Sequence, residues 1–352
     1  MNRHRHPARA FTLVEILVSV GILTVLSVML MTIANQVGIA WRDGESQNLR
    51  RSNGRAILDF LASEMQQATT GITQPEILDF SASTPAFTSL STHFAASLPA
   101  VTGSAAADFN LDEAEADGTN AYLNPHAVFW QSPIARDASR GMIASVGYYV
   151  RWIGTQPQLC RFYVDPTNTA NFTVFNSTKN DATGEIRYAN WVSSTVLDAV
   201  SPAAAPDYEG WFADNVIALF VRPLDAWGTP ITRDADKNLT NFGYGFDSRR
   251  GYYSCGPDKT WDNGTDDDVA VSAPALPPAV EITIVTLDSR ALARIGTADV
   301  TTIQITAKAK AQDPTKLWDA DDGVQGFIAG LPTGLRQSAR YFTTTVYLAN
   351  AK

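Results

Sequence analysis

An acidic side chain stands near the start of the longest apolar segment of the chain. Glu15 follows Phe11-Thr12-Leu13-Val14, and residues 16–34 carry no formal charge and are rich in Leu, Val, Ile and Met. An ionised carboxylate inside such a segment is costly in a membrane, so acidic residues at these positions usually have a function. The sequence therefore predicts a functional role for Glu15.

A second group of carboxylates lies in residues 253–269, which read YSCGPDKTWDNGTDDDV. Gly256 and Gly264 permit tight turns there. Hard oxygen ligands on one flexible loop suit Ca²⁺, which takes about six to eight oxygens at roughly 2.3–2.6 Å. The spacing is not that of an EF-hand, and a solvated acidic turn is the alternative. We expect calcium ligands among Asp258, Asp262, Asp266, Asp267 and Asp268.

Other residues suited to chemistry are few. His93 and His126 are the only histidines beyond the first six residues, and His126 lies in an apolar run typical of a core strand. The chain has no His-Glu-x-x-His, Gly-x-Ser-x-Gly, Walker A or Gly-x-Gly-x-x-Gly motif. Cys160 and Cys255 permit a disulfide if they face an oxidising compartment, but their separation leaves its geometry open. We therefore expect no enzyme, although a fold can bring the paired carboxylates of a glycoside hydrolase together from any positions.

Composition excludes several classes of protein. With 45% hydrophobic residues in 352, the chain can bury a core, which excludes wholesale disorder. The net charge of −9, from 27 basic and 36 acidic residues, argues against a nucleic-acid partner bound through a basic surface. Two cysteines cannot form a disulfide-dense scaffold or a four-cysteine zinc site.

The N-terminal segment predicts a single membrane pass. Residues 1–10 contain Arg3, Arg5 and Arg9 and no acid. The apolar run that follows can cross a bilayer core of about 30 Å as a helix rising about 1.5 Å per residue. The positive-inside rule places residues 1–10 in the cytoplasm and the chain after about residue 40 outside. A plain signal anchor and a cleaved signal peptide are the alternatives, but the run exceeds the usual apolar core of about 7–15 residues in a signal peptide.

The elements that position these residues are a long helix and a β-rich head. Residues 45–68 place apolar side chains at spacings of three, four and seven, which predicts an amphipathic helix packed on the head and ending near Gly71 and Pro75. Residues 80–125 read as a long loop. Strand-like segments follow without a βαβ rhythm, so we expect an α+β fold in which the helix packs on an antiparallel sheet. These segments are 126–131, 143–153, 159–164, 214–222, 279–288, 299–309 and 341–349.

The segment Ala10-Phe11-Thr12-Leu13-Val14-Glu15 resembles the type IV prepilin signature, a basic leader followed by Phe-Thr-Leu-x-Glu and a long apolar helix. The resemblance implies that prepilin peptidase cleaves after Ala10, where the family usually has Gly, and methylates the new amino terminus at Phe11. It implies that the Glu15 carboxylate pairs with the N-terminal amine of a neighbouring subunit, and adjacent opposite charges in lipid would fix the register between subunits. The expected domains are a leader at 1–10, a helix at 11–70 and a head at 71–352.

Further segments narrow the resemblance. Four of them together are similar to the pilin-like Verru_Chthon cassette protein C, which resembles large minor pseudopilins of type II secretion; they are 126–131, 214–219, 276–283 and 340–346. Residues 225–230, DAWGTP, resemble the Asp-Pro-Trp-Gly-Asn-Pro segment of major pseudopilins, in which a later acidic loop binds calcium. Residues 254–258 match the start of that loop, with Lys259 in place of the usual Gly.

The resemblance implies a structural subunit of a type IV pilus-like or type II secretion-like filament. It implies an inner-membrane helix, a periplasmic head, and, as partners, prepilin peptidase, other pilin or pseudopilin subunits, an inner-membrane assembly platform and membrane lipid. The large head favours a minor subunit, because bulky heads crowd a helical shaft. A membrane-anchored module that binds a glycan or a protein through its aromatic-rich head is the alternative function.

Overall fold

The structure is a computed structural model. It describes residues 12–69, 94–95, 127–169, 172, 177–179, 186–188, 211–231, 246, 248, 251–259, 268–272, 275–311 and 323–351. The chain forms two compact units, Met1–Arg55 and Ala56–Lys352, and the boundary between them falls inside one helix.

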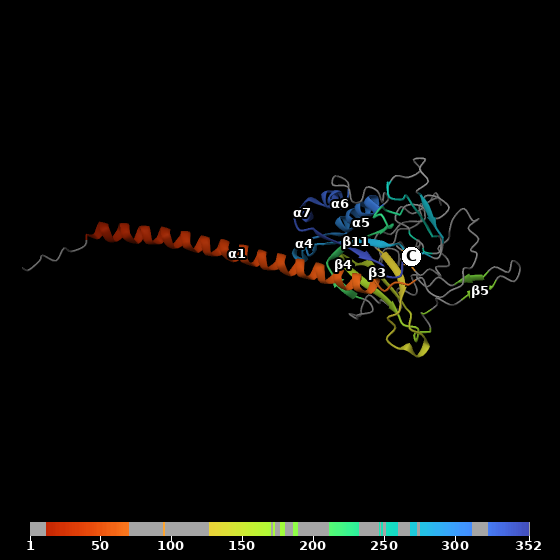
Figure 1. Cartoon of the computed structure of the whole chain (residues 1–352). Coiled ribbons are helices and arrows are strands. Elements are labelled where there is room, and N and C mark those ends of the chain that lie inside the picture. Colours follow the sequence, from red (N-terminus) through yellow and green to blue (C-terminus); the bar gives the residue numbers. More distant parts are fainter. Residues whose placement is uncertain are drawn as a thin grey trace, which may run out of the picture. The chain divides into compact units, whose positions relative to one another are not determined.

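The first element is the long helix α1, Leu13–Met65, which confirms the predicted N-terminal helix (Figure 1). Its segment Leu13–Gly38 is long and apolar enough to cross a membrane, and none of it is buried. The hydroxyls in this segment bond to carbonyls of the same helix. Ser19 Oγ donates to Ile16 O at 2.9 Å and Thr32 Oγ1 to Val28 O at 2.9 Å. Such internal bonds satisfy polar groups where no water is present.

The head contains one sheet built from consecutive strands. Its order is β1-β2-β3-β4-β7, and every neighbouring pair is antiparallel. The strands are β1 (Phe94–Ala95), β2 (Ala127–Ser132), β3 (Ala144–Ile153), β4 (Gln156–Val164) and β7 (Trp211–Asp214). Trp130 of β2 and Tyr148 of β3 stack with ring centroids 5.8 Å apart. The paired strands confirm the prediction of an antiparallel head.

A second antiparallel sheet has the order β12-β11-β8, formed by β8 (Val216–Leu224), β11 (Ala279–Thr286) and β12 (Arg340–Tyr347). Asn215 links β7 of the first sheet to β8 of the second with a φ of 64°, a left-handed conformation that Asn tolerates better than most residues. Its N–H donates to Pro157 O at 3.1 Å and its carbonyl accepts from Leu287 N at 2.9 Å. This residue therefore ties both sheets together where the chain passes between them.

Two short hairpins and several helices complete the described part of the head. The hairpins are β5 (Ser177–Lys179) with β6 (Ile186–Tyr188) and β9 (Tyr252–Ser254) with β10 (Val269–Val271). The helices are α4 (Ser289–Leu292), α5 (Thr297–Ala311), α6 (Val324–Gly330), α7 (Thr333–Arg336) and the 3₁₀ helix η2 (Ala138–Arg140). Phe327 of α6 meets Phe220 of β8 edge to face at 5.5 Å, which packs this helix on the second sheet.

The prediction of a strand at 299–309 was wrong, because this segment lies in α5. Its β-branched residues suggested a strand, but Val300, Ile303 and Ala307 are buried at spacings of three and four, the period of a helix. Asp299 Oδ2 accepts a hydrogen bond from Gly296 N at 2.9 Å at the helix start. The threonine hydroxyls bond back to carbonyls four residues earlier, as Thr302 Oγ1 does to Ala298 O at 2.9 Å.

The C-terminal turns of α1 pack on the head, as the amphipathic pattern predicts. Leu58, Leu61, Met65 and Ala68 are buried in the same core cluster as Trp130 and Tyr148. The helix ends at Met65, before Gly71 and Pro75, and Thr69 then pairs with Gln131 of β2 as an isolated bridge. The predicted loop at 80–125 lies outside the described residues, apart from the two residues of β1.

Candidate functional site

The start of α1 is closed by a reciprocal pair of contacts between Thr12 and Glu15. Glu15 Oε2 accepts from Thr12 N at 2.9 Å and from Thr12 Oγ1 at 3.0 Å, and Glu15 N donates to Thr12 Oγ1 at 3.3 Å. This is a capping box, in which a Thr and an acid three residues later satisfy each other's backbone N–H groups. Ala10 and Phe11, the predicted processing residues, lie outside the described residues.

The capping box gives Glu15 a defined position at the membrane-capable segment. Glu15 is the only ionisable residue from Leu13 to Gly38. A carboxylate in the first turn also lies beside the N–H groups that form the positive end of the helix dipole. The geometry therefore holds a negative charge at the exposed N-terminal end of an otherwise apolar helix.

In the head, Asp225 joins the two segments that resemble the major pseudopilins. It is 3% exposed and opens the turn after β8. Its Oδ1 accepts from Trp227 N at 2.9 Å and from Thr229 N at 2.8 Å, and its Oδ2 accepts from Ser254 Oγ at 2.8 Å. The DAWGTP turn thus fixes the residue at which the predicted calcium loop begins, a contact that the sequence alone does not reveal.

The hairpin β9–β10 brings the two ends of the acidic loop together, since Ser254 pairs with Val269. Asp258 is exposed in the turn after β9, and Asp268 immediately precedes β10, where its Oδ2 accepts from Tyr253 Oη at 3.4 Å. Asp262, Asp266 and Asp267 lie outside the described residues. Within the described ranges, no three His, Cys, Asp or Glu side chains form a group that could hold a metal.

Lys259 takes the conformation that a glycine would adopt in this turn. Its φ is 59°, and that of Gly256, three residues earlier, is 68°. Left-handed backbone favours glycine and costs other residues free energy. Lys259 therefore holds a left-handed turn at the position where the resemblance predicts a Gly.

The two cysteines are buried free thiols, and the disulfide that the sequence permits is not formed in this structure. Burial raises the pKa of Cys160 to about 12. Cys255 lies beside the Asp225 carboxylate, with Sγ 3.8 Å from Oδ2, and burial together with this charge raises the pKa of its thiol. Both thiols are therefore protonated near neutral pH and weak nucleophiles.

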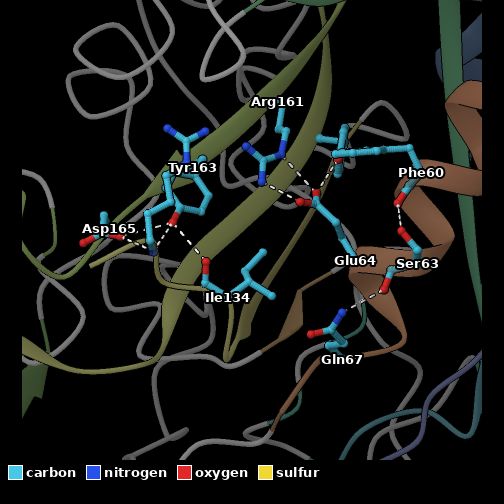
Figure 2. Close-up of polar contacts among 10 residues, drawn as sticks. Phe60, Ser63, Glu64, Gln67, Ile134, Arg161, Tyr163 and Asp165 are labelled. Carbon is cyan, nitrogen blue, oxygen red and sulfur yellow. Dashed lines mark hydrogen bonds and ion pairs between the residues drawn. The ribbon is translucent and has the colours of Figure 1, made fainter. Parts of the chain in front are cut away.

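A buried ion pair connects the end of α1 to the first sheet. Arg161 Nε donates to Glu64 Oε2 at 3.0 Å and Arg161 Nη2 to Glu64 Oε1 at 2.5 Å (Figure 2). Tyr148 Oη donates to the same Oε2 at 2.5 Å, and burial with the Glu64 charge raises the pKa of Tyr148 well above its ordinary value. The side chains of Arg161 and Glu64 are only 7% and 12% exposed. Two-point contact and burial make this a strong and specific link.

A neighbouring network holds the loop before η2 beside the end of β4. Tyr163 lies next to Arg161, and its hydroxyl contacts both Ile134 O and Asp165 Oδ2 at 3.1 Å (Figure 2). Asp165 also accepts from Arg136 N at 2.8 Å and from Thr167 N at 3.1 Å. Although partial burial acts to raise it, hydrogen bonds from Thr167, Arg136 and Asp137 lower the pKa of Asp165 to about 2.

Comparison with protein families matches the N-terminal part of the chain. A family model described as the prokaryotic N-terminal methylation motif matches residues 5–31. These residues include the end of the basic segment, the Thr12–Glu15 capping box and most of the apolar part of α1. No curated protein and no solved structure matches the chain.

Proposed function

We propose that this chain is a structural pseudopilin. The premise is that the methylation motif marks it as a type IV pilin-like precursor processed by prepilin peptidase. The chain is cleaved after Ala10 and N-methylated at Phe11, and it assembles through α1 into a type IV pilus-like or type II secretion-like filament. The motif indicates a structural subunit and not an enzyme. The match over residues 5–31, with a membrane-capable helix directly behind the Phe-Thr-Leu-x-Glu sequence, carries the proposal.

The proposal includes a topology and a set of partners. The helix lies in the inner membrane with residues 1–10 cytoplasmic and the head periplasmic, as the positive-inside rule favours. Other pilin subunits contact α1, and an inner-membrane platform drives assembly. The large size of the head makes this a minor subunit of the filament. The closer relation to Verru_Chthon cassette protein C belongs to the same proposal, supported by the sequence segments that resemble it.

Mass analysis of the N-terminus in native membranes tests the processing step. We expect a chain that begins at N-methylated Phe11, and an Ala10→Gly variant should be cleaved at least as completely, because Gly is the usual residue before the cut. Residues 1–10 still attached in cells with active prepilin peptidase would contradict the proposal. That result would favour the membrane-anchored binding module instead.

We further propose that the acidic loop binds Ca²⁺ through Asp258 and through Asp262, Asp266, Asp267 and Asp268. Two described contacts support this site. The β9–β10 hairpin closes the loop at both ends, and Asp225 fixes Ser254 at its start. Carboxylate oxygens converging from a closed loop are ligands that Ca²⁺ prefers.

Thermal melting with added Ca²⁺ tests this site separately from the processing step. At a calcium concentration of about 100 times Kd, binding to the folded state alone stabilises it by about 2.7 kcal/mol. The rise in Tm should disappear in Asp258→Ala. It should persist in the control Asp59→Ala, which removes an exposed carboxylate of α1 that is distant in sequence from the acidic loop. A calcium effect that is equal in both variants would show non-specific screening of the acidic head.

A further inference from the structure

Strand β12 forms an edge of the second sheet. It pairs with β11 along its whole length, Arg340–Tyr347, without a shift in register, and no strand in the described part of the chain pairs with its other side. Residues 341–347 contain no charged residue, no Pro and no Gly. Natural sheets usually protect an open edge with a charge, a proline or a bulge. The one charged residue of β12, Arg340, stands at its first position. From residue 341 to 347 the edge has none of these features, so within the described part of the chain its backbone N–H and C=O groups are open to pairing with another strand.

The sequence of β12 is complementary to itself. Residues 341–347 read Tyr-Phe-Thr-Thr-Thr-Val-Tyr, nearly the same in both directions about Thr344. When two copies pair antiparallel about this residue, each Tyr341 faces a Tyr347 of the other copy, and Phe342 likewise faces Val346. Threonines face threonines between them. Aromatic, apolar and Thr–Thr pairs are the cross-strand combinations that stabilise antiparallel sheets.

The burial of β12 agrees with such a pairing. Its outward row consists of Tyr341, Thr343, Thr345 and Tyr347, all exposed, with Tyr341 43% and Tyr347 73% accessible. The inward row, Phe342, Thr344 and Val346, is half-buried or buried. A two-fold axis normal to the sheet keeps each row on its own face, so exposed tyrosines would meet exposed tyrosines. Thr283 Oγ1 and Thr343 Oγ1, 2.7 Å apart, also tie the outward row to β11.

We propose that β12 is a self-association edge, at which a second copy of this chain adds its own β12 antiparallel about Thr344. The two three-stranded sheets then become one sheet of six strands. A two-fold interface requires a surface complementary to itself, and the near-palindromic strand supplies one. Seven paired residues make a small contact, so we expect it to form where the membrane-capable helix holds copies at a high local concentration. The inference concerns the head and does not depend on filament assembly.

Disulfide trapping of the full chain in membranes tests the register. One tagged copy carries Tyr341→Cys and a differently tagged copy carries Tyr347→Cys. The two positions face each other across the proposed pair, so the mixed dimer should cross-link. Each variant alone should not, because six residues at about 3.4 Å each separate position 341 from its own equivalent by about 20 Å. A disulfide needs Cα atoms within about 7 Å. The wild-type chain controls for the buried Cys160 and Cys255.

A charge on the edge tests the same contact without a cross-link. Thr345→Lys places two lysines near the two-fold axis and should lower the yield of the mixed cross-link about tenfold. Thr301→Lys, the same change at an exposed position of α5, should leave it unchanged. Equal Tm values of the two lysine variants show that both heads fold. Single variants that cross-link as strongly as the mixture, no mixed product, or capture of a different protein at Tyr341→Cys would overturn the proposal.

Discussion

The two ends of α1 each carry a glutamate whose carboxylate is held by hydrogen bonds, but the donors come from different distances along the chain. Glu15 is bonded by Thr12, three residues away. Glu64 is bonded by Tyr148 and Arg161, 84 and 97 residues away. The first contact is complete within one turn of helix and is exposed. The second exists only when the first sheet has formed, and it is almost fully buried.

The difference explains what each carboxylate can do. A capping box needs no partner from the rest of the fold, so Glu15 keeps its place at the helix start and stays accessible to another chain. Glu64 is committed to its own head, because a buried charge without its partner is costly. One helix thus presents a carboxylate available for association at its beginning and a carboxylate used for folding near its end.

Breaking the buried pair should produce the largest effect. Glu64→Ala leaves the Arg161 guanidinium buried without its carboxylate partner, and loss of one partner of a buried pair costs about 3–5 kcal/mol in the free energy of unfolding. Denaturant unfolding of the full chain in detergent measures the change. Asp59→Ala removes an exposed acid of the same helix and should change stability by less than about 0.5 kcal/mol. Similar unfolding midpoints for the two variants would contradict the role given to Glu64.

Removing the charge of Glu15 should leave the head intact and affect association. Glu15→Gln keeps a side chain that can complete a capping box but removes the negative charge. We expect the Tm of the head to stay at the wild-type value, because the hydrogen bonds of Glu15 are to Thr12 of the same helical turn. Under the proposed filament assembly, incorporation should fall roughly tenfold or more, because the variant cannot form the proposed charge pair in lipid. Quantification of the subunit in sheared filaments checks this expectation.

Glu15→Asp provides the matched control for that experiment, since it retains the charge on a shorter side chain. If the aspartate variant assembles better than the glutamine variant, the charge matters more than the cap. Normal incorporation of Glu15→Gln would remove the assembly role assigned to this carboxylate, and the capping box alone would then account for the acid at this position.

The same contrast between local and distant contacts sets what the sequence could predict. Local sequence patterns predict the helix, its membrane-capable half and six of the seven strand segments. A local pattern, an acid inside an apolar run, also singles out Glu15 as a candidate functional residue. The remaining segment, 299–309, lies in α5 because burial of Val300, Ile303 and Ala307 outweighed the strand preference of its β-branched residues. Neither the Glu64–Arg161 pair nor the Asp225–Ser254 contact has a local signature, since their partners meet only in the folded head.

Asp165 combines the two kinds of contact seen at Glu15 and Glu64, because some of its hydrogen-bond donors are close in sequence and others are distant. Thr167 is two residues away, whereas the backbone N–H groups of Arg136 and Asp137 come from the loop before η2. These bonds lower its pKa in the folded head to about 2, below the roughly 3.9 of an unfolded aspartate. A lowered folded-state pKa gives stability that is present above the unfolded pKa and is lost as the pH falls towards the folded one.

We therefore expect the Tm of the wild-type head to fall between about pH 4 and pH 2 by more than that of Asp165→Asn, which cannot titrate. The difference should be small, because the carboxylate is partly solvated and its charge is screened. Above pH 5 the wild type should be the more stable of the two, since an amide accepts the loop N–H groups less strongly than a carboxylate does. Parallel acid-side Tm profiles for the two proteins would show that the loop contacts stabilise the head by their geometry, and that Asp165, like Glu15, carries a charge on which the fold does not depend.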